Sequence, residues 1–137
     1  MTRLAGLGAN IVAAPYTSCM GTLEGSFELF EYDGGDPLYH LARAHNNTVC
    51  PHGMGLRLKA MSRAIGELGI DGVVFASNMS CKVFSVMQMD EQRHVSETLG
   101  VPAVMIDMDH ADPRKYNEEG VFLRLQALLE AIDAKRA

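Results

Sequence analysis

The sequence lacks most of the patterns by which enzymes and binding proteins are usually identified. It contains no tryptophan, no C-x-x-C pair, no H-E-x-x-H helix and no EF-hand loop, which excludes the common closed metal sites. It also has no Walker loop, no G-x-G-x-x-G after a strand and no G-x-S-x-G elbow. The standard nucleotide sites and the α/β-hydrolase nucleophile are therefore excluded as well.

Positive charge and long apolar runs are also scarce. The chain has 12 basic and 17 acidic residues, a net charge of −5, and no basic stripe that would bind nucleic acid. No apolar run approaches the roughly 18 residues that a membrane-spanning helix needs. No convincing signal-peptide cleavage site follows the N-terminus, and three cysteines are an odd number. We therefore expect a cytoplasmic protein with reduced cysteines that binds neither nucleic acid nor a membrane.

Apolar runs and helical periodicity alternate along the 137 residues. Strands are expected at Ala9–Ala14, Thr48–Cys50, Gly72–Ala76 and Val101–Ile106. Helices are expected at Leu23–Phe30, Asp36–His45, Leu56–Leu68, Lys82–Leu99 and Glu118–Asp133. This alternation predicts one α/β domain over residues 1–137, with a Rossmann-like open parallel sheet of about four strands and helices on both faces.

The stretch from Gly72 to Lys82 carries the strongest local signal. Its apolar run is typical of a strand buried on both faces, and Cys81 falls where the next helix begins. Ligands bind at this carboxyl edge of open α/β sheets, and a helix N-terminus favours the thiolate form of cysteine. Ser80 is expected to cap the helix, and Lys82 offers a nearby cation. The same position also suits a small buried hydrophobic cysteine.

The three cysteines are evenly spaced. Cys19, Cys50 and Cys81 lie 31 residues apart each time (50−19 and 81−50), and each follows a strand candidate. The spacing indicates that all three lie on one sheet edge, as an iron–sulfur cluster would require; the other interpretation is coincidence. A nucleophilic cysteine paired with His52 or His110 is a further possibility.

The turn from Asp107 to Arg114 is rich in carboxylates. Such a turn resembles a Mg²⁺ site, but carboxylates and Asn117 near helix starts more often act as caps that complement the helix dipole. We expect caps here.

Four motifs follow one another from Asp36 to the C-terminus, and each is weak alone. They are Asp36-Pro37-Leu38 with Leu41-Ala42-Arg43, Cys50-Pro51 and Arg57; Asp71-Gly72-Val73-Val74 with Ser77-Asn78, Ser80-Cys81-Lys82; Leu99-Gly100-Val101-Pro102 with Asp109; and Asp112-Pro113-Arg114 with Glu118-Glu119, Arg124 and Leu128-Leu129-Glu130. Their order and spacing resemble the C-terminal domain of the 2-hydroxyacyl-CoA dehydratase D-component family, which includes benzoyl-CoA reductase subunits.

The resemblance implies an oxygen-sensitive enzyme that acts on an acyl-CoA and carries a 4Fe-4S cluster. Such enzymes pair two related subunits, and an ATP-dependent activator supplies the electron that forms a ketyl radical from the thioester. Cys81 matches a cluster ligand of the family, while Cys50 and Cys19 correspond to ligands less directly. Ser80 and Lys82 flank Cys81 and are expected at the cofactor.

Family subunits are considerably longer, so the resemblance implies a missing N-terminal half or a companion subunit. We expect the isolated chain to be inactive. Two rival hypotheses remain: a non-catalytic Rossmann-like module that forms a subunit interface, and a Cys-His thiol enzyme.

Overall fold

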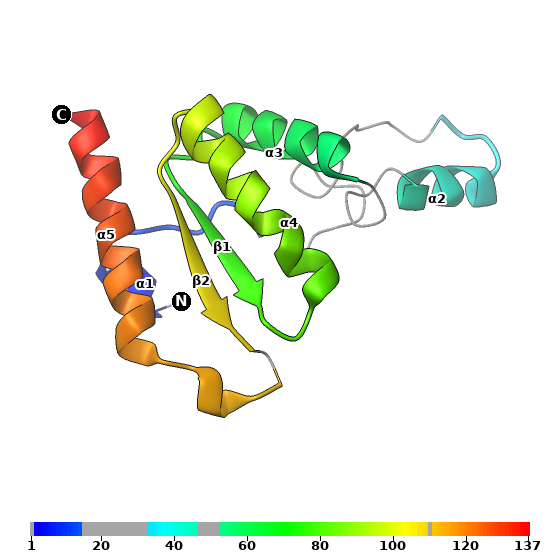
Figure 1. Cartoon of the computed structure of the whole chain (residues 1–137). Helices are drawn as coiled ribbons and strands as arrows, with labels where there is room; N and C mark the ends of the chain where they lie inside the picture. The colour runs from blue at the N-terminus through cyan, green and yellow to red at the C-terminus, as the bar shows by residue number, and fades with distance from the viewer. Residues whose placement is uncertain (1, 15–32, 47–52, 110) are drawn as a thin grey trace. The chain divides into compact units, whose positions relative to one another are not determined.

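The computed structural model describes residues 2–14, 33–46, 53–109 and 111–137 (Figure 1). By their contacts, the residues form two compact units. The first consists of Met1–Asn10 with Asp71–Ala137, and the second of Ile11–Ile70. The first unit contains the sheet and the Cys81 turn, so it receives most of the description below.

The sheet of the first unit consists of two parallel strands, β1 (Val73–Asn78) and β2 (Ala103–Met108). Their register runs from Val73 opposite Ala103 to Asn78 opposite Met108. Phe75 and Ile106 are 5% and 4% exposed and lie in the core. Val74 is 44% exposed and Ala76 is exposed too, so the expectation that β1 is buried on both faces is wrong: its residues alternate between a buried and an exposed face. The two strands expected around Gly72–Ala76 and Val101–Ile106 are confirmed, each displaced by one to two residues.

The expected strand at Ala9–Ala14 is wrong, because these residues have no regular secondary structure. Ile11 and Val12 are 50% and 55% exposed. An apolar run becomes a strand only when a neighbouring strand pairs with its backbone, and the sequence pattern cannot show that partner. The expected elements at Thr48–Cys50 and Leu23–Phe30 lie outside the described residues. The described fold is therefore mixed α/β with a two-stranded parallel sheet, and the expected four strands are not confirmed.

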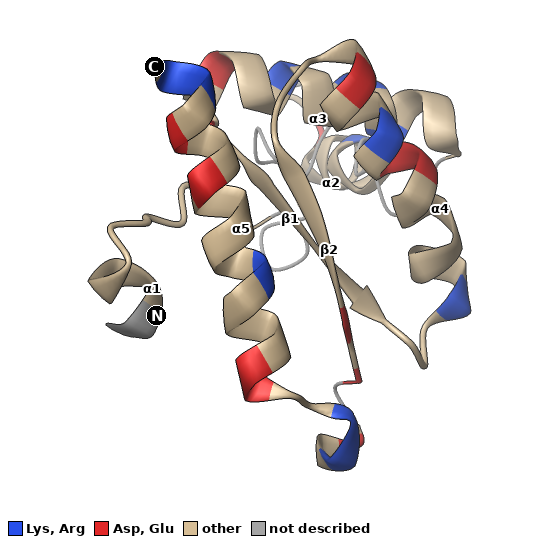
Figure 2. Ribbon diagram, turned by 60° about the vertical axis from the view of Figure 1, so that its left-hand side comes forward, with Lys and Arg blue, Asp and Glu red and all other residues tan. Residues whose placement is uncertain are grey.

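Two helices cover the strands from opposite sides (Figures 1 and 2). The first is α4 (Lys82–Arg93), which continues into a π-helical turn, η1 (His94–Thr98), and packs mainly against β1. The second is α5 (Glu118–Arg136), which packs against β2. This three-layer arrangement agrees with helices on both faces of a parallel sheet.

Helix α4 is joined to the strands partly through polar side chains. The Gln88 side-chain amide donates to the Ala76 carbonyl at 3.2 Å, and the Gln92 amide donates to the Ala103 carbonyl at 3.3 Å. Gln88 is only 3% exposed. These bonds give one carbonyl of each strand a side-chain partner and join α4 to both strands.

Helix α5 has the caps and charges that its sequence predicts. The Asn117 carboxamide oxygen accepts the Gly120 amide at 3.1 Å, which confirms the cap. Acidic residues occupy the first turn and basic residues the last (Figure 2), which complements the helix dipole. Leu125 and Leu128 of this helix are both 8% exposed and belong to the core.

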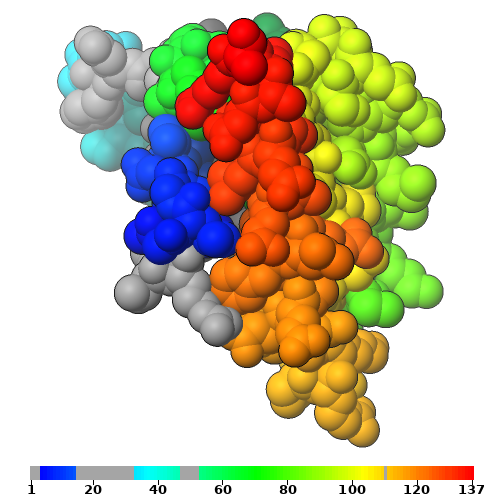
Figure 3. Space-filling model, turned by 90° about the vertical axis from the view of Figure 1, so that its left-hand side faces the viewer, coloured from blue at the N-terminus to red at the C-terminus, as the bar shows by residue number. Residues whose placement is uncertain are grey.

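Gly72 lies where α5 approaches the beginning of β1, and a side chain there would require Ile132 to shift. A Cβ atom at Gly72 would lie 2.6 Å from Ile132 Cδ1. The N-terminal helix α1 (Thr2–Gly6) lies beside α5 (Figure 3). This short helix has no counterpart among the sequence-based predictions.

In the second unit, the described helices are α2 (Pro37–Asn46) and α3 (Met54–Leu68). Asp36 accepts the Leu38 amide at 3.0 Å through its side chain, so the predicted start at Asp36-Pro37 is confirmed. Gly69 ends α3 with φ of 61°, the left-handed conformation that glycine adopts without strain. None of the helices described is both long and apolar enough to cross a bilayer.

Candidate functional site

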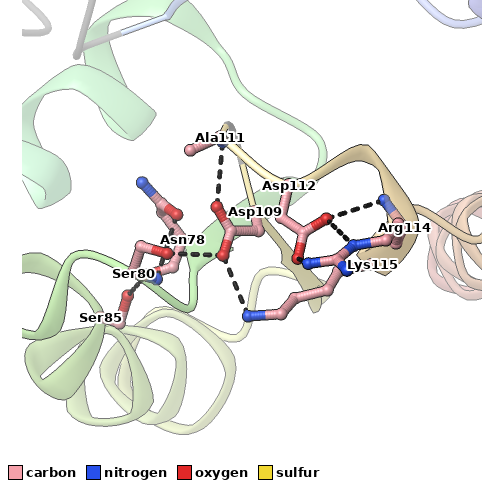
Figure 4. Close-up of polar contacts among 8 residues, drawn as sticks. All are labelled: Asn78, Ser80, Ser85, Asp109, Ala111, Asp112, Arg114 and Lys115. Atoms are coloured by element: carbon pink, nitrogen blue, oxygen red, sulfur yellow. Dashed lines mark hydrogen bonds and ion pairs between the residues drawn. The ribbon is translucent and has the colours of Figure 1, made fainter.

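The turn between β1 and α4 is built around Asn78, the last residue of β1. The Asn78 carbonyl accepts the Cys81 amide at 2.9 Å and the Ser85 hydroxyl at 2.6 Å. The Asn78 side-chain oxygen accepts the Ser80 amide at 3.3 Å (Figure 4). Asparagine suits this position because its side chain can bond to the backbone two residues ahead. One residue thus fixes the path of the chain from the strand to the helix.

Cys81 lies at the beginning of α4, as expected. Its carbonyl accepts the Phe84 and Ser85 amides at 3.2 and 3.0 Å, and its side chain makes no capping bond. The thiol is free and exposed. The interpretation of Cys81 as a buried hydrophobic residue is therefore wrong. An exposed sulfur at a helix N-terminus is available to a metal or an electrophile.

Ser80 does not cap α4 as predicted. Its hydroxyl instead donates to the Asp109 carboxylate, with 2.5 Å between Ser80 Oγ and Asp109 Oδ2 (Figure 4). Ser80 and Asp109 follow neighbouring strands, and the register sets Asn78 opposite Met108. The two side chains meet because parallel strands bring their carboxyl ends to one edge. The separation of 29 residues along the sequence gave no sign of this pair.

The Asp109 carboxylate has three donors. Besides Ser80, its Oδ1 accepts the Ala111 amide at 2.9 Å and its Oδ2 lies 3.2 Å from Lys115 Nζ. These donors lower the pKa of Asp109 from 3.8 to about 2. The Ser80 hydroxyl has the largest effect, followed by the Ala111 N–H and then Lys115. The Asp109 side chain is 2% exposed. Asp109 is thus an ionised, nearly buried anchor at the end of β2.

The next carboxylate, Asp112, caps the short 3₁₀ helix η2 (Pro113–Lys115). Its Oδ1 accepts the Arg114 amide at 3.1 Å and the Arg114 Nε at 2.8 Å, and its Oδ2 accepts Arg114 Nη2 at 2.9 Å. The side-chain bonds from Arg114 lower the pKa of Asp112. The expectation that acidic residues of this turn act as caps is confirmed for Asp112.

The remaining residues of interest are only partly placed. Lys82 is the first residue of α4 and is exposed. Cys19 and Cys50, and also His52 and His110, lie outside the described residues, so the hypotheses of three converging thiols and of a Cys-His pair stay predictions. Within residues 2–14, 33–46, 53–109 and 111–137, no group of three His, Cys, Asp or Glu side chains could hold a metal ion.

The donor set of the described residues fits one ligand of an iron–sulfur cluster and no more. Cys81 offers an exposed thiol, the ligand type that such clusters use. A cluster held by four cysteines would need the others from elsewhere. The Asp109 carboxylate beside the turn is already engaged by three donors (Figure 4).

Comparison with known proteins gives a family and several relatives. The family described as 2-hydroxyglutaryl-CoA dehydratase, D-component, matches residues 1–132. A benzoyl-CoA reductase subunit of Thauera aromatica is 30% identical over 130 residues, which are 95% of this chain and 29% of that protein. The alpha subunit of the (R)-2-hydroxyglutaryl-CoA dehydratase of Acidaminococcus fermentans is 30% identical over 128 residues, 93% of this chain and 24% of that protein.

A third relative is the (R)-phenyllactyl-CoA dehydratase alpha subunit of Clostridium sporogenes, 29% identical over 136 residues, 99% of this chain and 31% of that protein. The chain spans less than a third of the length of these relatives. The family match also extends upstream of Asp36, where the motif resemblance began. The chain belongs to the 2-hydroxyglutaryl-CoA dehydratase D-component family.

Proposed function

We propose that this chain is the cluster-bearing C-terminal domain of an acyl-CoA dehydratase or benzoyl-CoA reductase-like subunit, with Cys81 as an iron ligand. The observation that carries the proposal is the free, exposed Cys81 thiol at the carboxyl edge of β1, in a chain of this family. The cluster, when bound, supplies a single electron to an acyl-CoA thioester. The reaction is either a 2-hydroxyacyl-CoA dehydration or a ring reduction of the benzoyl-CoA type.

The chain's own residues have three roles in this proposal. Cys81 holds one iron, and the Asn78–Cys81 turn sets the place of its sulfur. Ser80 and Lys82 flank the ligand, with the exposed Lys82 ammonium adding positive charge beside an anionic cofactor. Cys50 and Cys19 are the further candidate ligands within this chain.

The complete enzyme needs more than this chain. The chain spans less than a third of its relatives' length, which supports a missing N-terminal half or companion subunit that supplies the other ligands. These relatives are themselves named as subunits, which supports a paralogous partner. An ATP-dependent activator and a cytoplasmic location complete the proposal.

The test is anaerobic purification of the complete polypeptide that carries this segment, together with its companion subunit. Iron and acid-labile sulfide are measured per complex, with Met79→Ala as a matched control because Met79 is an exposed side chain of the same turn. Cys81→Ala is expected to lose cluster iron while Met79→Ala keeps it. A Cys81→Ala protein with its full iron and sulfide content would refute the assignment.

A colourless wild-type protein that folds in air and still forms its subunit contacts would support the rival interface module instead. Rapid, stoichiometric alkylation of Cys81 in a protein that never contains iron would support a thiol enzyme.

A further inference from the structure

We infer that Asp109 is a positioning residue for the Cys81 sulfur and acts through the Ser80 hydroxyl. Asp109 lies at the end of β2, and it reaches the Cys81 turn from the neighbouring strand. This inference rests on the proposed function, because positioning the Cys81 sulfur matters for activity only if Cys81 binds iron. The positioning itself can be measured without a cluster.

Two bonds tie the Cys81 turn to the end of β2. The Met79 amide donates to the Met108 carbonyl at 2.8 Å, which extends the strand pairing one residue beyond β1. The Ser80 hydroxyl then bonds to Asp109, the residue after Met108. These contacts continue the parallel pairing from the backbone into side chains. The turn is therefore fixed against β2 immediately before the cysteine.

The anchor is suited to hold the turn. A hydroxyl that donates to an ionised carboxylate forms a shorter and stronger bond than a neutral pair does, and the 2.5 Å separation agrees with this. The Asp109 side chain is 2% exposed. The Ala111 amide and the Lys115 ammonium hold the carboxylate from the other side. The Asp109 carboxylate is thus held in place by bonds that do not depend on Ser80.

The position of Ser80 determines that of the sulfur. Ser80 and Cys81 are consecutive, and Cys81 begins α4, so a rotation of the chain at Ser80 moves the thiol relative to the helix. Ser80 is itself exposed, which means that packing does not replace its bond to Asp109. Loss of either partner should therefore loosen the turn more than the core.

Amide hydrogen exchange of the cluster-free chain tests this, with Ser80→Ala and Asp109→Ala as the variants. The Met79 and Cys81 amides are expected to exchange about tenfold faster in both, and the core amide of Phe75 should accelerate clearly less than they do. Ser80→Thr keeps the hydroxyl and adds a methyl group at an exposed site, so it should restore slow exchange. Asp112→Ala is the matched control, because Asp112 caps a neighbouring turn and its carboxylate bonds to Arg114.

The double variant Ser80→Ala/Asp109→Ala should exchange no faster than Asp109→Ala alone, because Asp109→Ala already removes the bond to Ser80. Additive effects of the two substitutions, or unchanged exchange at Met79 and Cys81, would overturn the inference. An equal acceleration at Phe75, Met79 and Cys81 would show only a general loss of stability, and that result too would overturn a positioning role.

The cluster gives a second measurement that separates this inference from the proposed function. In the anaerobic holoprotein, Ser80→Ala and Asp109→Ala should change the electron paramagnetic resonance spectrum of the reduced cluster, and Ser80→Thr should preserve it. If the wild-type protein contains no cluster but its exchange data are as expected, the positioning role stands and the proposed function fails. If Cys81→Ala loses iron but substitutions at Ser80 and Asp109 change neither the exchange rates nor the spectra, the positioning role fails and the proposed function stands.

Discussion

The loops that follow β1 and β2 lie side by side at one sheet edge, yet they use their side chains in opposite ways (Figure 4). After β1, backbone bonds to Asn78 shape the turn, and the Cys81 side chain is left exposed and free. After β2, the carboxylates of Asp109 and Asp112 accept donors of their own loop and, in the case of Asp109, the Ser80 hydroxyl. The first loop leaves a thiol exposed, and the second uses its carboxylates to bind donors.

The number of charged residues in a loop therefore does not show which loop leaves a side chain free to bind a ligand. The β2 loop has more charged residues, and its sequence resembles a Mg²⁺ site. The engagement of Asp109 by three donors gives it a structural role, whereas the less conspicuous cysteine stays accessible. The predictions below test this division, beginning with the largest effect.

The largest expected effect comes from the core that supports both loops. Leu128→Ala removes a side chain that is 8% exposed, and the cavity should lower the free energy of unfolding by about 2–5 kcal/mol. Denaturant unfolding measures the change. Leu123→Ala, on the same helix but 68% exposed, is the control and should stay within about 0.5 kcal/mol. Equal losses in both variants would contradict the described packing of α5.

The second effect concerns the β2 loop, where a side chain caps the next helix. Asn117→Ala removes the acceptor of the Gly120 amide, and should lower the free energy of unfolding by about 1 kcal/mol. Denaturant titration at neutral pH measures it. Asn117→Asp keeps an acceptor oxygen and should retain most of the stability. If alanine and aspartate behave alike, the cap contributes nothing.

The third effect is a dependence on pH. The pKa of Asp109 is lowered from 3.8 to about 2, so its contribution to stability is complete above about pH 4 and is lost as the pH falls to about 2. Unfolding free energies measured across this range should fall less steeply in Asp109→Asn than in the wild type. Asp112→Asn is the control, and its curve should lie closer to the wild type because Arg114, its main partner, is 88% exposed. If Asp112→Asn reduces the pH dependence of the unfolding free energy more than Asp109→Asn does, this prediction is wrong.

The smallest effect on stability is expected at Cys81, the residue that we propose as an iron ligand. Cys81 is exposed and its side chain makes no capping bond, so Cys81→Ala should change the free energy of unfolding of the cluster-free chain by about 0.5 kcal/mol or less. Thermal and denaturant unfolding both measure this. A large loss would show that the thiol supports the turn, and the division of roles between the two loops would then be wrong.

Much of the local structure follows from short patterns in the sequence. The apolar run after Gly72 gives β1, Asp36-Pro37 begins α2, Gly69 ends α3, and Asn117 caps α5. Each depends on residues within a few positions of one another, and sequence order presents these directly.

Where a strand needs a partner, the sequence predicted less well. Ala9–Ala14 and the run in β1 are both short and apolar, but only β1 is a strand. The difference is that β1 pairs with β2, a contact between residues 30 positions apart in register. Apolar character makes a strand possible, and backbone pairing decides whether it forms.

The Cys81 turn shows both kinds of information. That Cys81 follows a strand and lies at the start of a helix could be predicted from the sequence, because strand and helix signals are local. Only the tertiary structure shows that Ser80 bonds to Asp109 instead of capping the helix, and that the Cys81 thiol is exposed. The reason is physical: the parallel register brings two distant strand ends together, and a hydroxyl there binds an ionised carboxylate in preference to a helix amide.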